Sequence, residues 1–200
     1  MFTVRMDVSD RPALLEHLLA LGSEDRRLRF GHIARDSSIE RYSMDIDFER
    51  DALFGVQGTH GGRQFDGIMH LALDKDHAEI GVSVLEHARG LGIGSALVSR
   101  AAVHARNRSI DVLFMQCLSE NGAIMRVARR LGMKVVTQGI DSEASMPLPA
   151  ANAFSIMREK VTDQIALCDA TLRELLLSHA PRVPIQLQSK RERAAAGKYI

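Results

Sequence analysis

The chain has 200 residues, of which 46% are hydrophobic and 26% charged, a composition typical of a globular domain. Its 26 Lys and Arg nearly balance 25 Asp and Glu, so the net charge of +1 provides no field for binding nucleic acid or an acidic membrane. An N-terminus without an apolar leader, the lack of a long apolar run and only two cysteines lead us to expect a cytoplasmic protein with neither a membrane span nor a disulfide framework.

The N-terminal half predicts helices followed by an antiparallel meander. A helix is expected over about 11–21, because four leucines form one apolar face and Gly22 follows. Residues 23–50 carry many charges of both signs, which is typical of a solvated helical region. Three short strands are expected at 52–57, 67–73 and 78–85, and their close spacing favours an antiparallel arrangement.

The second half predicts alternating helices and strands. Apolar residues at helical spacing indicate a helix over 92–107 and another over 121–131, which Gly132 ends. The nearly continuous apolar run at 112–118 predicts a strand covered on both faces. Strands are also expected at 134–140 and around 145–148, and these two can pair with each other.

A long helix is predicted from about 152 to 179. Its apolar stripe has helical spacing, which suits packing either on the same domain or on a second copy of the chain in a homodimer; the stripe consists of Val161, Ile165, Cys168, Leu172 and Leu175. We therefore expect a domain at 1–150, this helix at 151–181 and a mobile tail at 182–200.

A glycine-rich turn joins the strand at 78–85 to the helix that follows. Gly90, Gly92 and Gly94 would let backbone N–H groups approach a phosphate, and the helix N-terminus adds unpaired donors. The same glycines would also serve a turn needed only for packing. The turn lacks the Gly-Lys-Ser/Thr ending of a Walker A loop and the spacing of a Rossmann fingerprint.

The remaining pattern, [Gln/Arg]-x-x-Gly-x-[Gly/Ala], is matched by Arg89, Gly92 and Gly94 and resembles the coenzyme A pyrophosphate motif of the GNAT superfamily of N-acetyltransferases. Leu118-Ser119-Glu120-Asn121, with Leu131-Gly132-Met133 further on, is similar to the family's strand end, helix-opening Asn and helix exit. The resemblance covers roughly residues 1–148. It implies an α/β (α+β) GNAT fold: a mixed central sheet of about six to seven strands, splayed between the fourth and fifth, flanked by helices and extended by the C-terminal helix.

The resemblance also implies acetyl-CoA as co-substrate, held by the turn, by the helix-opening Asn and by the backbone of the preceding strand. In that family the Asn at the position of Asn121 commonly contacts the pantetheine arm, and Asn is also a good helix N-cap on its own account. The implied binding residues are Val82, Val84, Arg89, Gly90, Leu91, Gly92, Ile93, Gly94, Ser95 and Asn121. We expect no metal, because the His and Cys residues have no metal-ligand spacing.

Transfer to an amine requires a proton acceptor, because an alkylamine has a pKa near 10. Glu79 matches the position of the family's general base, and burial near the substrate channel would raise its pKa to a useful value. The alternative is a strand Glu that is salt-bridged or faces solvent. Many family members carry a tyrosine acid where this chain has Ala128, so the resemblance supplies no general acid, although Ser119 or Cys117 can donate a proton.

A narrower resemblance links Arg27-Leu28-Arg29-Phe30 and the segments 46–53 and 78–84 to the acetyltransferase domain of bacterial protein-lysine acetyltransferases. The predicted function is therefore acetyl transfer from acetyl-CoA to a primary amine, on a protein lysine or a small molecule. Two alternatives stay open: a non-catalytic acyl-CoA-binding or regulatory module, and an interaction protein that dimerises through its C-terminal helix.

Overall fold

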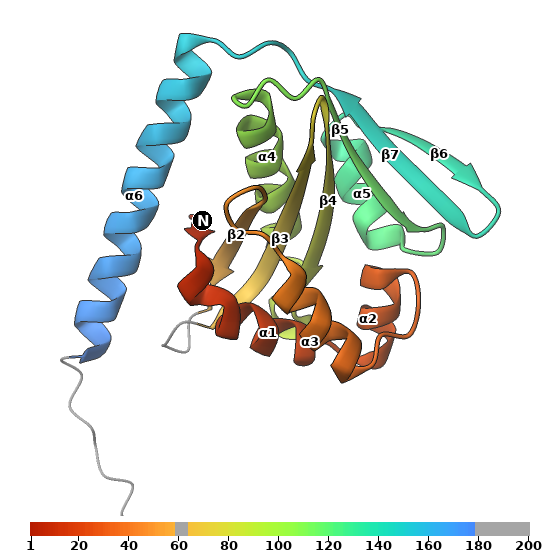
Figure 1. Ribbon diagram of the computed structural model, residues 1–200, viewed down its shortest axis with the longest axis horizontal. Coiled ribbons are helices and arrows are strands. Elements are labelled where there is room, and N and C mark those ends of the chain that lie inside the picture. Colours follow the sequence, from red (N-terminus) through yellow and green to blue (C-terminus); the bar gives the residue numbers. More distant parts are fainter. Residues whose placement is uncertain (59–63, 179–200) are drawn as a thin grey trace, which may run out of the picture.

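The computed structural model describes residues 1–58 and 64–178, which form a seven-stranded mixed sheet with helices on both faces (Figure 1). The strand order is β1-β2-β3-β4-β5-β7-β6. The strands are β1 Val4–Met6, β2 Ala52–Gln57, β3 Phe65–Asp74, β4 His77–Val84, β5 Val112–Leu118, β6 Lys134–Gln138 and β7 Asp141–Pro147. The helices are α1 Arg11–Leu19, α2 Ser23–Phe30, α3 Asp36–Asp45, α4 Ile93–Arg106, α5 Gly122–Arg130 and α6 Ala153–Ser178, with short 3-10 turns at Val8–Asp10 and Glu86–Ala88.

Two hydrophobic cores lie on opposite faces of the sheet. One core includes Phe54, Ile80 and Leu97 and lies under α4 and α5. The other includes Leu14 and Ile39 and lies under α1 and α3. Alternation along a strand sends neighbouring side chains to opposite faces, so β2 and β3 contribute to both cores, whereas β4, β5 and β7 contribute to the core under α4 and α5. This two-sided burial confirms the predicted mixed α/β fold.

Most of the predicted strands are confirmed. β2, β3 and β4 form the expected antiparallel meander, and β6 pairs with β7. β7 lies between β5 and β6, an order that chain position alone does not give. The edge strand β1, which pairs with β2, was not predicted because its three residues are too few to show an alternating pattern.

The sheet opens between β4 and β5, as predicted. The two strands pair in parallel only at His77–Val112, Ala78–Leu113 and Glu79–Phe114, and beyond Glu79 they diverge. The cover expected on both faces of β5 is wrong. Leu113 is buried in the core under α4 and α5, whereas Gln116 on the other face is exposed.

Helix α6 runs beside the domain, against β1 and α4 (Figure 1). Its buried face consists of Ser155, Glu159 and Ala166. In the predicted apolar stripe, Val161 and Ile165 are exposed, and the stripe therefore faces away from the domain. The last predicted helical residue and the predicted tail at 182–200 lie outside the described residues.

Polar contacts attach α6 to α4. Glu159 accepts hydrogen bonds from His104 Nδ1 and Asn107 Nδ2, both at 2.6 Å, and Arg100 Nη2 lies 3.4 Å from its Oε1. Burial lowers the pKa of His104, so its ring is neutral near pH 7 and donates through Nδ1–H. Burial also opposes ionisation of Glu159, but the hydrogen bonds from His104 and Asn107 and the charge of Arg100 outweigh it and lower the pKa to about 2.

We expect acid to detach α6. The pKa of Glu159 in the folded protein, about 2, lies below its ordinary value of 4.5. The carboxylate therefore stabilises docking fully above pH 4.5, and this contribution is lost as the pH falls toward 2. Amide exchange over residues 153–166, corrected for the intrinsic rate, should show roughly tenfold or greater loss of protection between pH 6 and pH 3. Glu159→Gln should show weak protection at both values, and equal protection of the wild type at both would contradict this account.

Candidate active site

The edge of β4 that faces β5 carries backbone groups without a partner strand. The Leu85 N–H donates to the Asp66 carbonyl at 2.8 Å, on the β3 side. N–H directions alternate along a strand, so the amides of Val82 and Val84 point to the opposite edge. β5 has already diverged there. This edge can therefore hydrogen-bond an extended ligand that carries amide groups.

The turn after β4 presents backbone amides to solvent. Gly90 and Gly92 have φ angles of 78° and 83°, in the left-handed region that strains any residue with a Cβ. A Cβ at either position would meet no atom within 4 Å, so the space above the turn is open. Ile93, Gly94 and Ser95 form the first turn of α4, where amides have no intrahelical acceptor and the helix dipole is positive. An anion is stabilised at such a position.

A cavity of about 460 Å³ lies above this turn, between α2 and α5. Its charged lining consists of Asp25, Arg29, Arg89, Arg126 and Arg130, an excess of cations. Arg89 is the cation nearest the glycines. Its Nη2 lies 2.5 Å from Asp25 Oδ2, so the two side chains form an ion pair. The sequence analysis missed Arg126 and Arg130; their spacing of four residues places them on one face of α5, but a solvated helix shows the same pattern.

A second cavity, of about 250 Å³, adjoins the first at the point where β4 and β5 part. Leu28, Arg29, Val82, Asn121 and Ile124 line both cavities. The acidic residues of the second cavity are Glu79 on β4 and Asp141 on β7. The two spaces together can hold one elongated ligand and a second group that meets it beside Glu79.

Glu79 lines this second cavity but is exposed, so its expected burial is wrong. Its neighbours Ala78 and Ile80 are buried because they point to the opposite face of the strand. The apolar neighbours in the sequence therefore say nothing about the surroundings of the carboxylate itself.

Asn121 is the N-cap of α5 and also lines both cavities. Its Oδ1 accepts from the Ile124 N–H at 3.3 Å, and its Nδ2 lies 3.5 Å from the Leu28 carbonyl oxygen. The structure thus shows the capping role. Ala128 is fully buried in the core, and burial raises the pKa of the half-buried Cys117 thiol, which makes its thiolate less accessible.

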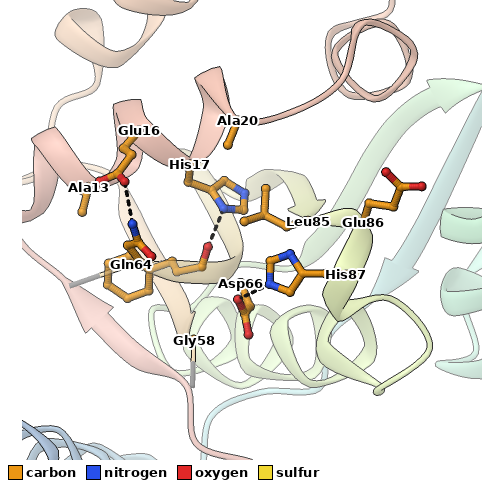
Figure 2. A pocket seen from close by; sticks show the side chains of 11 residues that line it. Ala13, Glu16, His17, Ala20, Gly58, Gln64, Asp66, Leu85, Glu86 and His87 are labelled. Carbon is orange, nitrogen blue, oxygen red and sulfur yellow. Dashed lines mark hydrogen bonds and ion pairs between the residues drawn. The ribbon is translucent and has the colours of Figure 1, made fainter. Parts of the chain in front are cut away.

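A larger cavity, of about 670 Å³, lies beside α1 and β3 (Figure 2). Both histidines that line it have partners: His17 Nδ1 donates to the Phe65 carbonyl, and His87 lies 2.8 Å from Asp66. Burial lowers the pKa of His17 to about 4, so its ring is neutral. No residue that lines this cavity lines either of the other two. It is therefore separate from the gap between β4 and β5.

The described residues contain neither a metal cluster nor a membrane-spanning helix. In residues 1–58 and 64–178, no group of three or more His, Cys, Asp or Glu side chains is placed to hold a metal ion. None of the described helices is long and apolar enough to cross a bilayer.

Comparisons with known proteins place these features in a family. The model of the acetyltransferase (GNAT) family matches residues 17–133. The GNAT domain of S. lividans PAT aligns with a TM-score of 0.62 at 19% identity, over 73% of this chain and 89% of that one. The ribosomal-protein-alanine N-acetyltransferase from Brucella melitensis gives 0.56 at 16% identity, over 74% and 100%. RimL, a ribosomal L7/L12 alpha-N-protein acetyltransferase in complex with coenzyme A, gives 0.56 at 17% identity, over 74% and 94%.

The ion pair between Arg89 and Asp25 should compete with an anion for the cleft. We expect Asp25→Asn to raise the affinity for inorganic pyrophosphate about twofold to fivefold, the worth of a partly exposed ion pair. Arg126→Gln should lower that affinity. Isothermal titration calorimetry at low salt measures both effects. Asp36→Asn is the matched control, because Asp36 pairs with Arg26 at the same 2.5 Å but outside the cleft. An unchanged or lower affinity of Asp25→Asn would contradict competition.

Proposed function

Because the chain belongs to the acetyltransferase (GNAT) family, as the motif at Arg89, Gly92 and Gly94 predicted, we propose that it transfers an acetyl group from acetyl-CoA to a primary amine. The acceptor is a protein lysine or a small molecule. The observation that supports this most is the meeting of two cavities where β4 and β5 part: one is cationic and rich in amides, and the other contains a carboxylate.

The residues of the cleft fit acetyl-CoA. The amides of the turn at 90–95, together with Arg89, suit a pyrophosphate, and Arg126 and Arg130 add cations for phosphate groups. The unpaired amides of Val82 and Val84 suit the amides of the pantetheine arm, as an added strand would. When bound, acetyl-CoA supplies an activated acyl thioester.

Glu79 acts as general base in this proposal. It accepts a proton from the incoming ammonium, directly or through a water molecule, so that a neutral amine attacks the acyl carbon. A β4 amide in the gap donates to the carbonyl oxygen as negative charge develops on it. No protein acid is needed for a leaving thiol whose pKa is about 8.5, so buried Ala128 is compatible with turnover.

Glu79→Gln tests the role of this carboxylate. We expect kcat/KM for the best amine of a panel of small amines and lysine peptides to fall by roughly 10²- to 10⁴-fold, the usual contribution of a general base. The Kd of acetyl-CoA should change by less than about twofold, because the Gln side chain keeps the shape of the cavity. Release of free thiol measures the rate, and calorimetry measures binding.

Glu143→Gln is the control, because Glu143 is an exposed glutamate on β7 that lines neither cavity of the gap. Equal losses in both variants would exclude a special role for Glu79. Saturable acetyl-CoA binding without turnover of any amine would favour the non-catalytic acyl-CoA-binding module. No binding at millimolar acetyl-CoA would contradict both functions.

We also propose that the exposed stripe of α6 mediates a homodimer. Val161, Ile165 and Leu172 are 51%, 46% and 57% exposed and lie along one side of the helix. An apolar stripe of this length on a surface marks an interaction site. The domain already contacts the opposite, more polar face, so the stripe is available to a second copy.

Ile165→Asp should convert the dimer to a monomer, because it buries a charge in an apolar interface. Sedimentation velocity at micromolar concentration distinguishes the two states. Gln164→Asp introduces the same charge at a neighbouring exposed position and should leave the dimer intact. A wild-type protein that sediments as a monomer would overturn this proposal.

A further inference from the structure

Arg29 occupies the junction of the two cavities and packs directly on β4. It lines both spaces. Its guanidinium rests on Gly81: a Cβ built at that glycine would lie 2.2 Å from Arg29 Nη2. Side chains at positions 79 and 81 share one face of the strand. The cation therefore occupies the side-chain position next to Glu79 on this face, where the proposed transfer takes place.

A chain of hydrogen bonds holds this guanidinium in place. Arg29 Nη2 donates to the Tyr42 oxygen at 2.9 Å, and the Tyr42 hydroxyl lies 2.7 Å from His70 Nδ1. His70 Nε2 lies 3.0 Å from Oδ2 of the buried Asp51. The rings of Phe30 and Tyr42 lie 5.1 and 5.7 Å from the guanidinium carbon and add cation–π contacts.

The protonation of His70 fixes the direction of this chain. Burial lowers the pKa of His70, so its ring is neutral near pH 7. Its single proton lies on Nε2, because the Asp51 carboxylate can only accept, and its Nδ1 must then accept from Tyr42. Tyr42 thus gives its proton to His70 and accepts from Arg29. The chain orients the guanidinium but places no negative charge beside it, and Arg50 pairs with the charge of Asp51.

Arg29 differs from its neighbours in having no carboxylate partner among the described side chains. Arg26 pairs with Asp36, and Arg27 pairs with Glu24 and Glu120. Among the side chains that the structure describes, no carboxylate lies within ion-pair distance of Arg29, and its Nε is both inaccessible and without a hydrogen-bond partner. Arg29 as a whole is only half-buried, but a guanidinium N–H that is shielded from water normally has a hydrogen-bond acceptor, and an anion in the adjoining cavities can pair with the charge.

We propose that Arg29 binds a carboxylate carried by the ligand that reacts beside Glu79. The carboxylate belongs either to the acyl group, as in a succinyl thioester, or to the acceptor, as in a free amino acid. In both cases the planar guanidinium, oriented by Tyr42, forms charge-assisted hydrogen bonds with the carboxylate oxygens. This inference rests on the proposed function and specifies which substrates the site prefers.

Paired ligands that differ in one carboxylate test the proposal on the whole 200-residue chain. In the donor arm, acetyl-CoA and succinyl-CoA are titrated into the wild type and into Arg29→Met. In the acceptor arm, amino acids and their amides are titrated into both proteins saturated with CoA. We expect Arg29→Met to lower the affinity for the carboxylate-bearing ligand of one pair by roughly tenfold or more. The affinity for its uncharged counterpart should fall by less than about twofold. The arm that responds identifies the source of the carboxylate.

Three variants separate recognition from loss of structure. Arg27→Met removes the same charge from the same helix, but Arg27 lines neither cavity, so affinities should not change. Arg29→Lys keeps a cation and should retain part of the preference for the carboxylate. Tyr42→Phe removes only the orienting hydroxyl and should reduce that preference while leaving the affinity for acetyl-CoA unchanged. Thermal unfolding of each variant verifies that it is folded.

The failures of the two proposals are distinguishable. If the wild type binds neither thioester, the proposed function is contradicted, and the role of Arg29 with it. If it binds both thioesters and Arg29→Met changes neither pair selectively, only the role of Arg29 is overturned. An equal loss of affinity for acetyl-CoA and succinyl-CoA in Arg29→Met would also overturn the role of Arg29, because it would assign the cation to the nucleotide part of the ligand.

Discussion

The structure depends on the early end of pairing between β4 and β5. Three residue pairs join the two strands, and beyond Glu79 the backbone of β4 has no neighbour on that side. Backbone N–H and C=O groups in a protein interior need hydrogen-bond partners. A sheet that opens at its centre therefore loses hydrogen bonds between two of its strands. The backbone groups that are left unpaired can bind an extended, amide-bearing ligand. The cationic cleft and the carboxylate of Glu79 lie at the two ends of this opening.

Glycines shape the opening in two different ways. Gly90 and Gly92 are required by their positive φ angles, which turn the chain from β4 into α4 and leave the amides uncovered. Gly81 has no such backbone constraint; its missing Cβ leaves room for the guanidinium of Arg29. A side chain from α2 thus takes the place of one from the strand, and α2 becomes part of the site.

Local patterns in the sequence predicted the parts of the fold that depend on local chemistry. The strands at 52–57 and 112–118 and the turn at Arg89 are recognisable because alternation, apolar runs and glycines act over a few residues. The family resemblance supplied the splay. The exposure of Glu79 and the outward stripe on α6 were not predictable, because each depends on which face of an element the rest of the domain covers. Arg29 was only one charge among many, since its place over Gly81 results from tertiary packing.

Helix α2 contributes two residues of opposite charge, Asp25 and Arg29, to different parts of the cleft. Asp25 pairs with the arginine of the glycine-rich turn and so moderates the positive charge at the end of the cleft that we propose binds phosphate. Arg29, four residues later and thus on the same side of the helix, places a positive charge at the reactive end. In the proposed function, opposite charges at the two ends of this helix face would let the affinity for the nucleotide part and the selectivity at the reacting group change independently. The unpaired guanidinium, oriented through Tyr42 and His70 without being neutralised, is therefore better explained by a ligand than by stability.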